Sequence, residues 1–490
     1  MYKLMFYLSR RHRVIAKKAF FTVYFFLAAL LFVLANPPDG LPRQIDLILN
    51  KPALKRVLIS ACVIRSATGE VVYERNPHLA LLPASNMKIV TSAAALERLG
   101  PDFTFVTRVG TCGDSLVVIG SGDPLLGLNG KTPDPGRNHQ NHNVIKDIVT
   151  RLKEREVKSI SDIILDTSVF DSQRTHPSWP REQLVQKYAC EVGGLNYQGN
   201  CVGVSIVNEK GKILLVLDPP TGYLSVVNAV TPVFGRQNWF SVERTGDRGR
   251  LLIRGKCANR AGPYSVAVED PALFFGQLLF ESLTREGIGV GGSILEQPLT
   301  ESCEFQPVVE FKTSIIDCLQ RMNKDSLSLA AEAVFKALGA QAQPTGKGGS
   351  WETGSRVVSE YLRSLGIGDG EFTIADGCGL SRENRLSASA IAKVFLHLSS
   401  GPYWETYEKT LAVGGIDGTI ENHFWERKYR GKVQAKTGYI QGVRALSGIV
   451  HTDRGDFIFS FLANRAGGWT RTAIDACVKA IIASNARPGK

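Results

Sequence analysis

The chain has 490 residues, of which 44% are hydrophobic and 21% are charged; these values exclude a disordered or fibrous protein and predict about two to four domains. The formal net charge is +12, but the first 35 residues supply six lysine and arginine side chains and no acid, which leaves +6 for the remainder. Because no basic block with interleaved aromatic residues follows, we expect no nucleic-acid partner. The mild excess indicates a solvated basic surface, with attraction to an acidic polymer as the alternative.

The N-terminus combines a basic tail, residues 1–18, with an uncharged apolar stretch, residues 19–35, after which Pro37 ends any helix. A basic flank before a single apolar stretch predicts a secretory signal or a membrane anchor, which places the rest of the chain in the periplasm or cell envelope. A buried core helix would not explain the one-sided positive flank. The stretch has an intermediate length and Ala35 offers a cleavage site, so the cleaved and the anchored forms both stay open.

The next segment, residues 36–105, opens on two β-rich runs separated at residues 67–69, which predict a hairpin. The hairpin leads to PASNMKIVTSAAALERLG, residues 83–100, a predicted helix that is apolar on most sides. Ser85 and Lys88 project from one face of this helix, where a hydroxyl and an amine can share a proton. Burial lowers the pKa of a lysine, so the pair is a candidate nucleophile and base. A chain of this length holds roughly one or two such spacings by accident, so the pair needs support from elsewhere.

Residues 106–300 have a different texture, in which short strand-like runs are broken by Gly, Pro, Asn and Asp. This texture predicts an inserted β-rich segment of one or two small domains, with a helical pattern at residues 144–155, and helical periodicity returns at residues 271–287. His139 and His142 have a spacing that suits a metal, but they lie in a polar loop without a third ligand. We therefore expect no metal site there.

Nine cysteines are scattered along the chain without metal-ligand spacing, and their odd number excludes complete pairing within the chain. Outside the cytoplasm some of them can pair, and Cys190 and Cys201 are the nearest candidates. Buried free thiols are nevertheless the expected state of most of them, and pairing is the alternative.

The last segment, residues 301–490, is rich in helical periodicity, which dominates residues 314–339 and resumes near Trp351. Two strands then turn at residues 453–455, and a helix closes the chain at about residues 470–484. We expect the early hairpin and these two strands to complete one antiparallel sheet flanked by helices, an α+β fold.

Two stretches of this last segment carry further candidate groups. Ser326 and Ser328 lie in MNKDSLSLAAEAVFK, where capping a helix is the plain alternative to a chemical role. The triplet Lys436-Thr437-Gly438 lies in a strand-like run. There the glycine lets a substrate backbone approach, while the lysine and threonine offer a cation and a hydroxyl to a carboxylate. Neither stretch is specific by itself.

The order of the three stretches is specific. S-x-x-K, then a turn that contains serine, then K-T-G on a strand resembles penicillin-recognising serine peptidases and β-lactamases. The chain closely resembles the D-alanyl-D-alanine carboxypeptidase/endopeptidase family of low-molecular-mass penicillin-binding proteins, which carry a large insert between the first and second motifs. Four flanking segments resemble the same family, so the similarity covers about residues 55–480. They are GSGDPLLG (120–127), GLNYQGNCVGV (194–204), DGCGLSRENRLS (376–387) and GGIDGTIENHF (414–424).

The resemblance implies a β-lactamase/transpeptidase-like catalytic domain in two parts, residues 36–105 and 301–490, interrupted by the insert. It implies a serine peptidase that cuts D-Ala-D-Ala bonds of peptidoglycan peptides without cofactor or metal, and β-lactams as covalent inhibitors.

The same resemblance implies a catalytic role for four motif residues. Ser85 is the expected nucleophile and Lys88 its base, and water then hydrolyses the acyl-enzyme. Ser326, assisted by Lys436, is expected to pass a proton to the leaving amine.

Four more residues are implied in substrate binding: Ser328, Thr437, Gly438 and Tyr439. Thr437 is expected to bind the terminal carboxylate. The backbone N–H groups of Ser85 and Tyr439 are expected to form the oxyanion hole.

Three positions depart from the family pattern, because Ser328 replaces the usual asparagine, Cys378 replaces a serine, and Tyr439 replaces a smaller residue. A serine has no amide, so it either loses a hydrogen bond to the substrate carbonyl or makes it through a water, and we expect reduced or redirected activity. Cys378 is expected to be packed and inert, with a reactive thiol as the alternative.

Two other functions stay open: a catalytically weakened cell-wall-binding or scaffold protein, and a related serine esterase or β-lactamase-like hydrolase.

Overall fold

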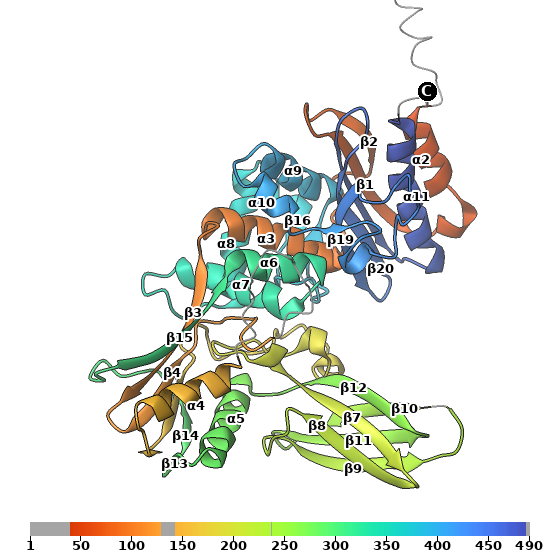
Figure 1. Cartoon of the computed structure of the whole chain (residues 1–490). Coiled ribbons are helices and arrows are strands. Elements are labelled where there is room, and N and C mark those ends of the chain that lie inside the picture. Colours follow the sequence, from red (N-terminus) through yellow and green to blue (C-terminus); the bar gives the residue numbers. More distant parts are fainter. Residues whose placement is uncertain (1–39, 129–142, 237, 487–490) are drawn as a thin grey trace, which may run out of the picture.

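The computed structural model describes residues 40–128, 143–236 and 238–486 (Figure 1). The basic tail, the apolar stretch that follows it and the loop with His139 and His142 lie outside these residues. In the part of the chain that the structure describes, no helix combines the length and the apolar character needed to cross a membrane.

One antiparallel sheet of six strands joins the two ends of the described chain (Figure 1). The N-terminal hairpin consists of β1 (Leu58–Arg65) and β2 (Val71–Arg75), and β1 pairs along its whole length with β21 (Phe457–Asn464). This confirms the expectation that the early hairpin and the two terminal strands share a sheet. In spatial order the strands are β18 (Ala412–Val413), β19 (Val433–Ile440), β20 (Val443–Val450), β21, β1 and β2.

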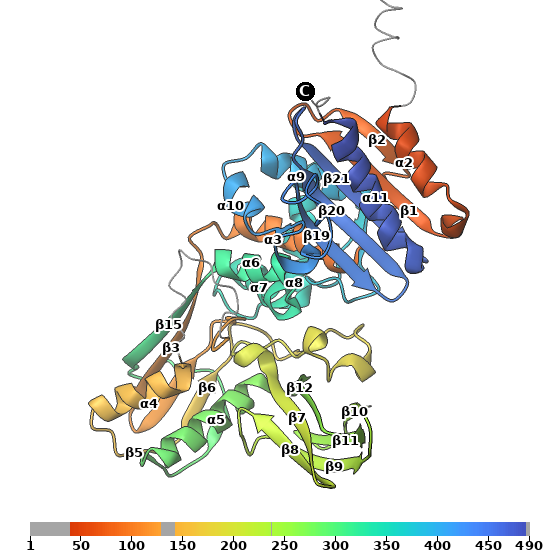
Figure 2. The same ribbon diagram turned by 45° about the vertical axis from the view of Figure 1, so that its right-hand side comes forward.

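Helices cover both faces of this sheet, which confirms the α+β class (Figure 2). On one face, α2 (Leu41–Leu49) and α11 (Gly468–Ser484) share a core with the strands. The other face carries α3 (Met87–Arg98), in which every residue from Met87 to Leu96 is buried. Its run of alanines lets neighbouring helices approach closely on several sides. The helices on this side are α6 (Ile315–Lys324), α7 (Ser328–Gln341), α8 (Trp351–Ser364), α9 (Ala388–Ser399) and α10 (Trp404–Glu408).

The helical pattern over residues 314–339 is divided, which the periodicity did not indicate. The first helix, α6, ends at Lys324, and Ser326 has a φ of 59° before α7 begins at Ser328. A positive φ is unusual for a residue with a side chain and is often found at functional sites. The break takes the Ser326 hydroxyl out of the regular helical arrangement.

The chain between α3 and α6 forms the insert, and it enters through β3 (Thr104–Cys112) and returns through β15 (Gln306–Ser314) as an antiparallel pair (Figure 1). Both strands belong to a five-stranded sheet that packs with α4 (Val144–Glu154) and α5 (Pro271–Arg285). The expected β-rich insert is thus confirmed, whereas the domain limits at residues 105 and 300 stay predictions.

The other described strands form one five-stranded sheet, two three-stranded sheets and two short pairs. The five-stranded sheet runs in the order β14 (Ile294–Glu296), β6 (Ile163–Asp166), β4 (Ser115–Ile119), β3 and β15. Two three-stranded sheets consist of β12 (Arg260–Ala267), β7 (Cys201–Glu209) and β8 (Lys212–Asp218), and of β10 (Trp239–Arg244), β11 (Arg250–Cys257) and β9 (Ser225–Pro232). Short pairs are formed by β5 (Ser159–Ile160) with β13 (Gly289–Val290) in the insert, and by β16 (Phe372–Thr373) with β17 (Arg385–Leu386) beside the helices.

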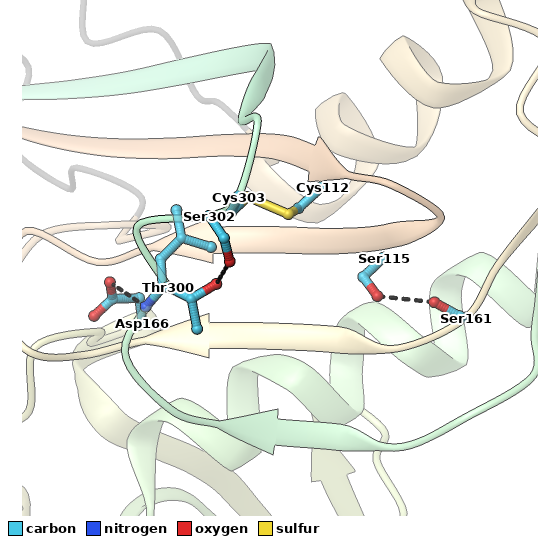
Figure 3. Close-up of a disulfide and its surroundings, with 8 residues drawn as sticks. Cys112, Ser115, Ser161, Asp166, Thr300, Ser302 and Cys303 are labelled. Carbon is cyan, nitrogen blue, oxygen red and sulfur yellow. Dashed lines mark hydrogen bonds between the residues drawn. A yellow bond between two sulfur atoms is a disulfide. The ribbon is translucent and has the colours of Figure 1, made fainter.

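One disulfide, Cys112–Cys303, ties the end of β3 to the segment that leads into β15 (Figure 3). Its cysteines are 191 residues apart in sequence. They meet because the pairing of β3 with β15 sets Thr111 opposite Gln306. The disulfide therefore closes the far end of this strand pair, whereas the chain enters and returns at the opposite end, where Thr104 faces Ser314.

The other seven cysteines are buried free thiols. Cys190 and Cys201 are among them, so both are buried free thiols, as expected, and the alternative of a bond between these nearest candidates is not found. Burial raises the pKa of Cys201 to about 12, which keeps its thiol protonated. Nearness in sequence was a poor guide, because strand pairing decides which sulfurs come together.

Candidate active site

The first motif brings a hydroxyl and an amine into contact. Ser85 lies in a short 3-10 turn, η2 (Ala84–Asn86), that leads directly into α3. With about three residues per revolution, such a turn places the side chains of residues i and i+3 one above the other. Lys88 Nζ lies 3.0 Å from Ser85 Oγ and 2.9 Å from the carbonyl oxygen of Cys378.

Lys88 is completely buried. Burial lowers the pKa of its amine, and the carboxylates of Glu332 and Asp376 nearby offset only part of that effect. A neutral amine beside a hydroxyl can accept the hydroxyl proton. The pair therefore has the geometry and the electrostatics of a nucleophile and its base.

A second hydroxyl–amine pair faces the first. Lys436 Nζ donates to Ser326 Oγ at 2.9 Å and to the carbonyl oxygen of Thr437 at 2.9 Å. Burial lowers the pKa of Lys436 well below its usual value, and the positive charge of Lys88 lowers it further. The structure thus brings the four predicted catalytic residues into one polar cluster between β19, α3 and the break before α7.

Contacts that the motifs did not reveal hold these elements in register. The Cβ of an alanine at Gly438 would lie 2.7 Å from the carbonyl oxygen of Pro83, so glycine lets β19 approach η2. Asn86 Nδ2 donates to the carbonyl oxygen of Lys436 at 2.8 Å, and Ser447 Oγ donates to Asn86 Oδ1 at 2.7 Å. A buried asparagine beside the serine of S-x-x-K is the signal that could have pointed to this connection.

The outer edge of β19 is open beside Ser85. The carbonyl oxygen of Val433 accepts from Gly414 N at 2.8 Å, on the side of β18. Since alternate residues of an antiparallel strand direct their backbone groups to the same side, Thr437 and Tyr439 face that side too. In the described chain β18 pairs only with residues 434–435. The backbone N–H and C=O groups of Thr437 and Tyr439 therefore have no strand partner on this side. An extended peptide can add to this edge.

The predicted substrate-binding side chains lie around that edge. Thr437 Oγ1 donates to Thr419 Oγ1 at 2.9 Å. Tyr439 is 64% exposed, and the Arg444 guanidinium lies 3.8 Å from its ring centre. Ser328 is half-buried at the first position of α7, and among the described residues no hydrogen bond joins its hydroxyl to another group.

A buried frame of carboxylates supports Lys88 from behind. Glu332 accepts from the backbone N–H groups of Gly377 at 3.1 Å and Cys378 at 2.6 Å, and from Trp351 Nε1 at 2.8 Å. Burial, together with the charge of Asp376, raises the pKa of Glu332 to about 7. Because the same turn presents the Cys378 carbonyl to Lys88, this frame sets where the amine points.

The ligand atoms of Glu332, Asp376 and Cys378 lie within 4.8 Å of one another, a grouping that resembles a metal site. The carboxylates, however, are already occupied, since Asp376 alone accepts from four N–H groups. Burial raises the pKa of Cys378 well above its usual value, so its sulfur is a protonated thiol in this packing. The trio is a hydrogen-bonded frame, and Cys378 fits the packed, inert interpretation.

The insert reaches this frame through one tryptophan. Trp179 Nε1 donates to Asp376 Oδ2 at 2.8 Å, and the neighbouring Ser178 Oγ lies 2.6 Å from Ser381 Oγ. Trp179→Phe removes the donor and keeps the ring. We expect acylation by penicillin to slow about tenfold and the free energy of unfolding to fall by about 1–3 kcal/mol, because a buried carboxylate oxygen loses a partner.

Stopped-flow acylation and thermal unfolding measure both effects, and the exposed Trp425→Phe is the matched control. If stability falls while the acylation rate stays the same, Trp179 serves folding alone.

Comparison with known proteins decides the family. The model of the D-Ala-D-Ala carboxypeptidase 3 (S13) family matches residues 41–483. The chain belongs to this family. A D-alanyl-D-alanine carboxypeptidase of Actinomadura is 30% identical over 473 residues, which cover 91% of this chain and 85% of that protein. DacB of Haemophilus influenzae, also named a D-alanyl-D-alanine carboxypeptidase, is 24% identical and the match covers 79% and 81% of the two chains.

Solved structures show the same S13 fold. Penicillin binding protein 4 of Haemophilus influenzae superimposes with a TM-score of 0.75 at 22% identity, over 89% of this chain and 98% of that one. The same protein was solved with a bound β-lactam, and that structure gives a TM-score of 0.72 at 21% identity, over 91% of this chain and the whole of the other. The resemblance based on the three motifs is thus confirmed, and the chain is a serine-type D-Ala-D-Ala peptidase of the S13 family.

Proposed function

We propose that this S13 peptidase cuts D-Ala-D-Ala-type bonds of peptidoglycan through an acyl-enzyme on Ser85. The observation that carries the proposal is the 3.0 Å contact between Ser85 Oγ and the buried amine of Lys88. As Ser85 Oγ bonds to the substrate carbonyl carbon, its proton passes to Lys88 Nζ. The peptide C–N bond then breaks, and the leaving amine takes a proton through Ser326, which Lys436 holds.

The negative charge that develops on the carbonyl oxygen is stabilised by the N–H groups of Ser85 and Tyr439. The open edge of β19 supports this role, because it leaves the Tyr439 N–H without a strand partner. A donor of this kind contributes about a hundredfold to a thousandfold in rate. Water then attacks the acyl carbon and frees Ser85, and β-lactams acylate the same oxygen as covalent inhibitors.

In the direct test, the protein is incubated with an acyl peptide that ends in D-Ala-D-Ala, and the released D-alanine is measured. We expect release by the unchanged protein and none above background by Ser85→Ala. A cross-linked muropeptide, followed by chromatography, separates endopeptidase from carboxypeptidase activity. A folded protein that cuts neither substrate contradicts the proposal.

The N-terminus completes the proposal. Action on the cell wall places the work of this family outside the cytoplasm, and residues 19–35 would direct export to the periplasm or cell envelope. The mass of the protein recovered from cells distinguishes removal after Ala35 from retention as an anchor.

The serine at position 328 predicts a gain of activity on reversion to the family pattern. Ser328→Asn supplies an amide that can bind the substrate carbonyl, so we expect kcat/KM for the D-Ala-D-Ala peptide to rise about threefold to tenfold. Ser328→Ala is the matched control and should stay within about twofold of the unchanged protein. Equal rates for all three proteins would show that this position no longer contributes to substrate binding.

A further inference from the structure

A cavity of about 450 Å³ lies in the insert, and none of its lining residues belongs to the catalytic motifs or to the edge of β19. It is formed by the segment that follows β6, by the carboxyl end of β14, and by Gly193, Gly194 and Ala272. The strands β4, β6 and β14 run parallel to one another. In sheets of parallel strands that helices cover, ligands bind in the crevice beyond the carboxyl ends of the strands. The cavity lies at this place in the five-stranded sheet.

The charged side chains of the lining are already paired. The guanidinium of Arg174 contacts the carboxylate of Glu296, and Asp171 Oδ1 lies 2.7 Å from Lys336 Nζ. Lys336 itself is completely buried on α7. Because each of these charges has a partner of opposite sign, the cavity offers no free cation to a phosphate or a carboxylate. It offers no unpaired carboxylate to an amine either, so the lining favours a neutral ligand.

Several neutral polar groups of the lining are free. Among the residues that the structure describes, no hydrogen bond engages the hydroxyls of Ser168 and Ser172 or the side-chain amide of Gln297. Asp171 uses Oδ1 for Lys336, and in the same part of the chain its other oxygen accepts no hydrogen bond. These groups supply donors as well as acceptors. They suit a neutral ligand that carries several hydroxyl groups.

The cavity has room for such a ligand. Its volume of about 450 Å³ falls in the range of about 300–1,000 Å³ that is typical of small-molecule sites. A Cβ at Gly193 would meet only backbone atoms of Leu195, at 3.6 and 3.8 Å, which are ordinary contacts. Because Gly193 lines the cavity, a longer side chain at this position would extend into free space and fill it.

The cavity adjoins the contact between the insert and the catalytic part of the chain. Asp171 N donates to the carbonyl oxygen of Gly349 at 3.0 Å, just before α8. Lys336, the partner of Asp171, lies eight residues after Ser328 on α7, which is about 12 Å along a helix. An extended peptide of four residues spans about 13 Å. The length of a short peptide therefore matches the separation between this contact and the start of α7.

We infer that the cavity binds a neutral sugar unit of the glycan strand of peptidoglycan, while the peptide attached to that strand extends toward Ser85. Sugars carry several uncharged hydroxyl groups, which match the free groups of Ser168, Ser172 and Gln297. The peptide fits the cavity less well, because its carboxylates would find no free cation there. The inference goes beyond the proposed function, since it assigns to the insert a contact with the polymer that does not depend on acylation.

The test uses full-length Ser85→Ala protein, so that no result depends on catalysis, and follows binding of the N-acetylglucosamine tetramer by NMR titration. We expect a dissociation constant of about 1 mM or lower. Adding Gly193→Met, which fills the cavity, should weaken binding at least about tenfold, and adding Gln297→Ala, which removes a free amide, about fivefold. Gln306→Ala removes the same group at an exposed position of β15, so it is the matched control and should leave the affinity unchanged.

The outcomes separate this inference from the proposed function. No binding of the tetramer up to about 10 mM contradicts the inference, and so does an affinity that neither cavity variant changes. If Gly193→Met does not fold, Gln297→Ala decides, and an affinity equal to that of the control counts against the inference. An acyl-D-Ala-D-Ala peptide is the second ligand: if Gly193→Met weakens its binding and leaves that of the sugar unchanged, the occupant is a peptide and the inference fails. If the sugar binds as expected while the unchanged protein releases no D-alanine, the proposed function fails and this inference stands.

Discussion

Replacing Lys88 by methionine will slow acylation by penicillin about a thousandfold or more, while the protein stays folded. Lys88 Nζ is within hydrogen-bond distance of Ser85 Oγ, and general-base catalysis contributes about a hundredfold to ten-thousandfold. Methionine has a similar volume and needs no solvation. It leaves the Cys378 carbonyl without its partner, so we expect stability to change by about 1–3 kcal/mol at most.

The pH dependence gives this prediction its sign. Burial lowers the pKa of Lys88 from its usual 10.5, so the neutral amine forms at lower pH. Acylation by the unchanged protein should therefore rise with pH and level off before pH 10.5, and this rise should vanish in Lys88→Met. Lys88→Arg should not recover the rate, because a guanidinium stays protonated. Lys393→Met on α9 is the control, and a Lys88→Met protein with the full rate and the same pH rise would assign the base elsewhere.

Replacing Lys436 by methionine will lower the rate of D-alanine release about a hundredfold to a thousandfold. Lys436 holds the Ser326 hydroxyl at 2.9 Å, and without it the proton relay to the leaving amine loses its orientation. The substitution leaves the binding of the substrate's acyl part unchanged. We therefore expect KM to change less than kcat. Ser326→Ala should give a loss of similar size.

The double variant Ser326→Ala/Lys436→Met checks that the two residues act as one unit. Its loss should be close to that of either single variant, because residues in one relay are not additive. Losses that multiply would show that the residues act in separate steps.

The sequence predicted the parts of the fold that local apolar patterns indicate. The hairpin before Ser85, the terminal strands and the buried character of α3 follow from apolar patterns, and all of them are found. The three motifs indicated which side chains to bring together. The contacts of Lys88 with Ser85 and of Lys436 with Ser326 give those predictions their geometry.

The remaining features depend on contacts between distant parts of the chain. The positive φ of Ser326 interrupts a run whose apolar periodicity continues across the break. The Cys112–Cys303 bond follows from the register of β3 and β15, which no spacing of cysteines encodes. The hydrogen bond from Trp179 to Asp376 joins the insert to the turn behind Lys88. In the sequence, the indication of this contact was the acid at position 376 in a glycine-rich segment, because a carboxylate that becomes buried needs hydrogen-bond donors.

Ser85 is the residue that we expect to become acylated, and mass spectrometry of the penicillin-treated protein tests this assignment. The full-length protein is incubated with benzylpenicillin, its intact mass is recorded, and the modified peptide is sequenced by tandem mass spectrometry. We expect one penicilloyl group per chain, attached to Ser85, and no adduct on Ser85→Ala. An adduct on Ser326, Ser328 or Cys378, or a folded protein that gains no mass, would contradict it.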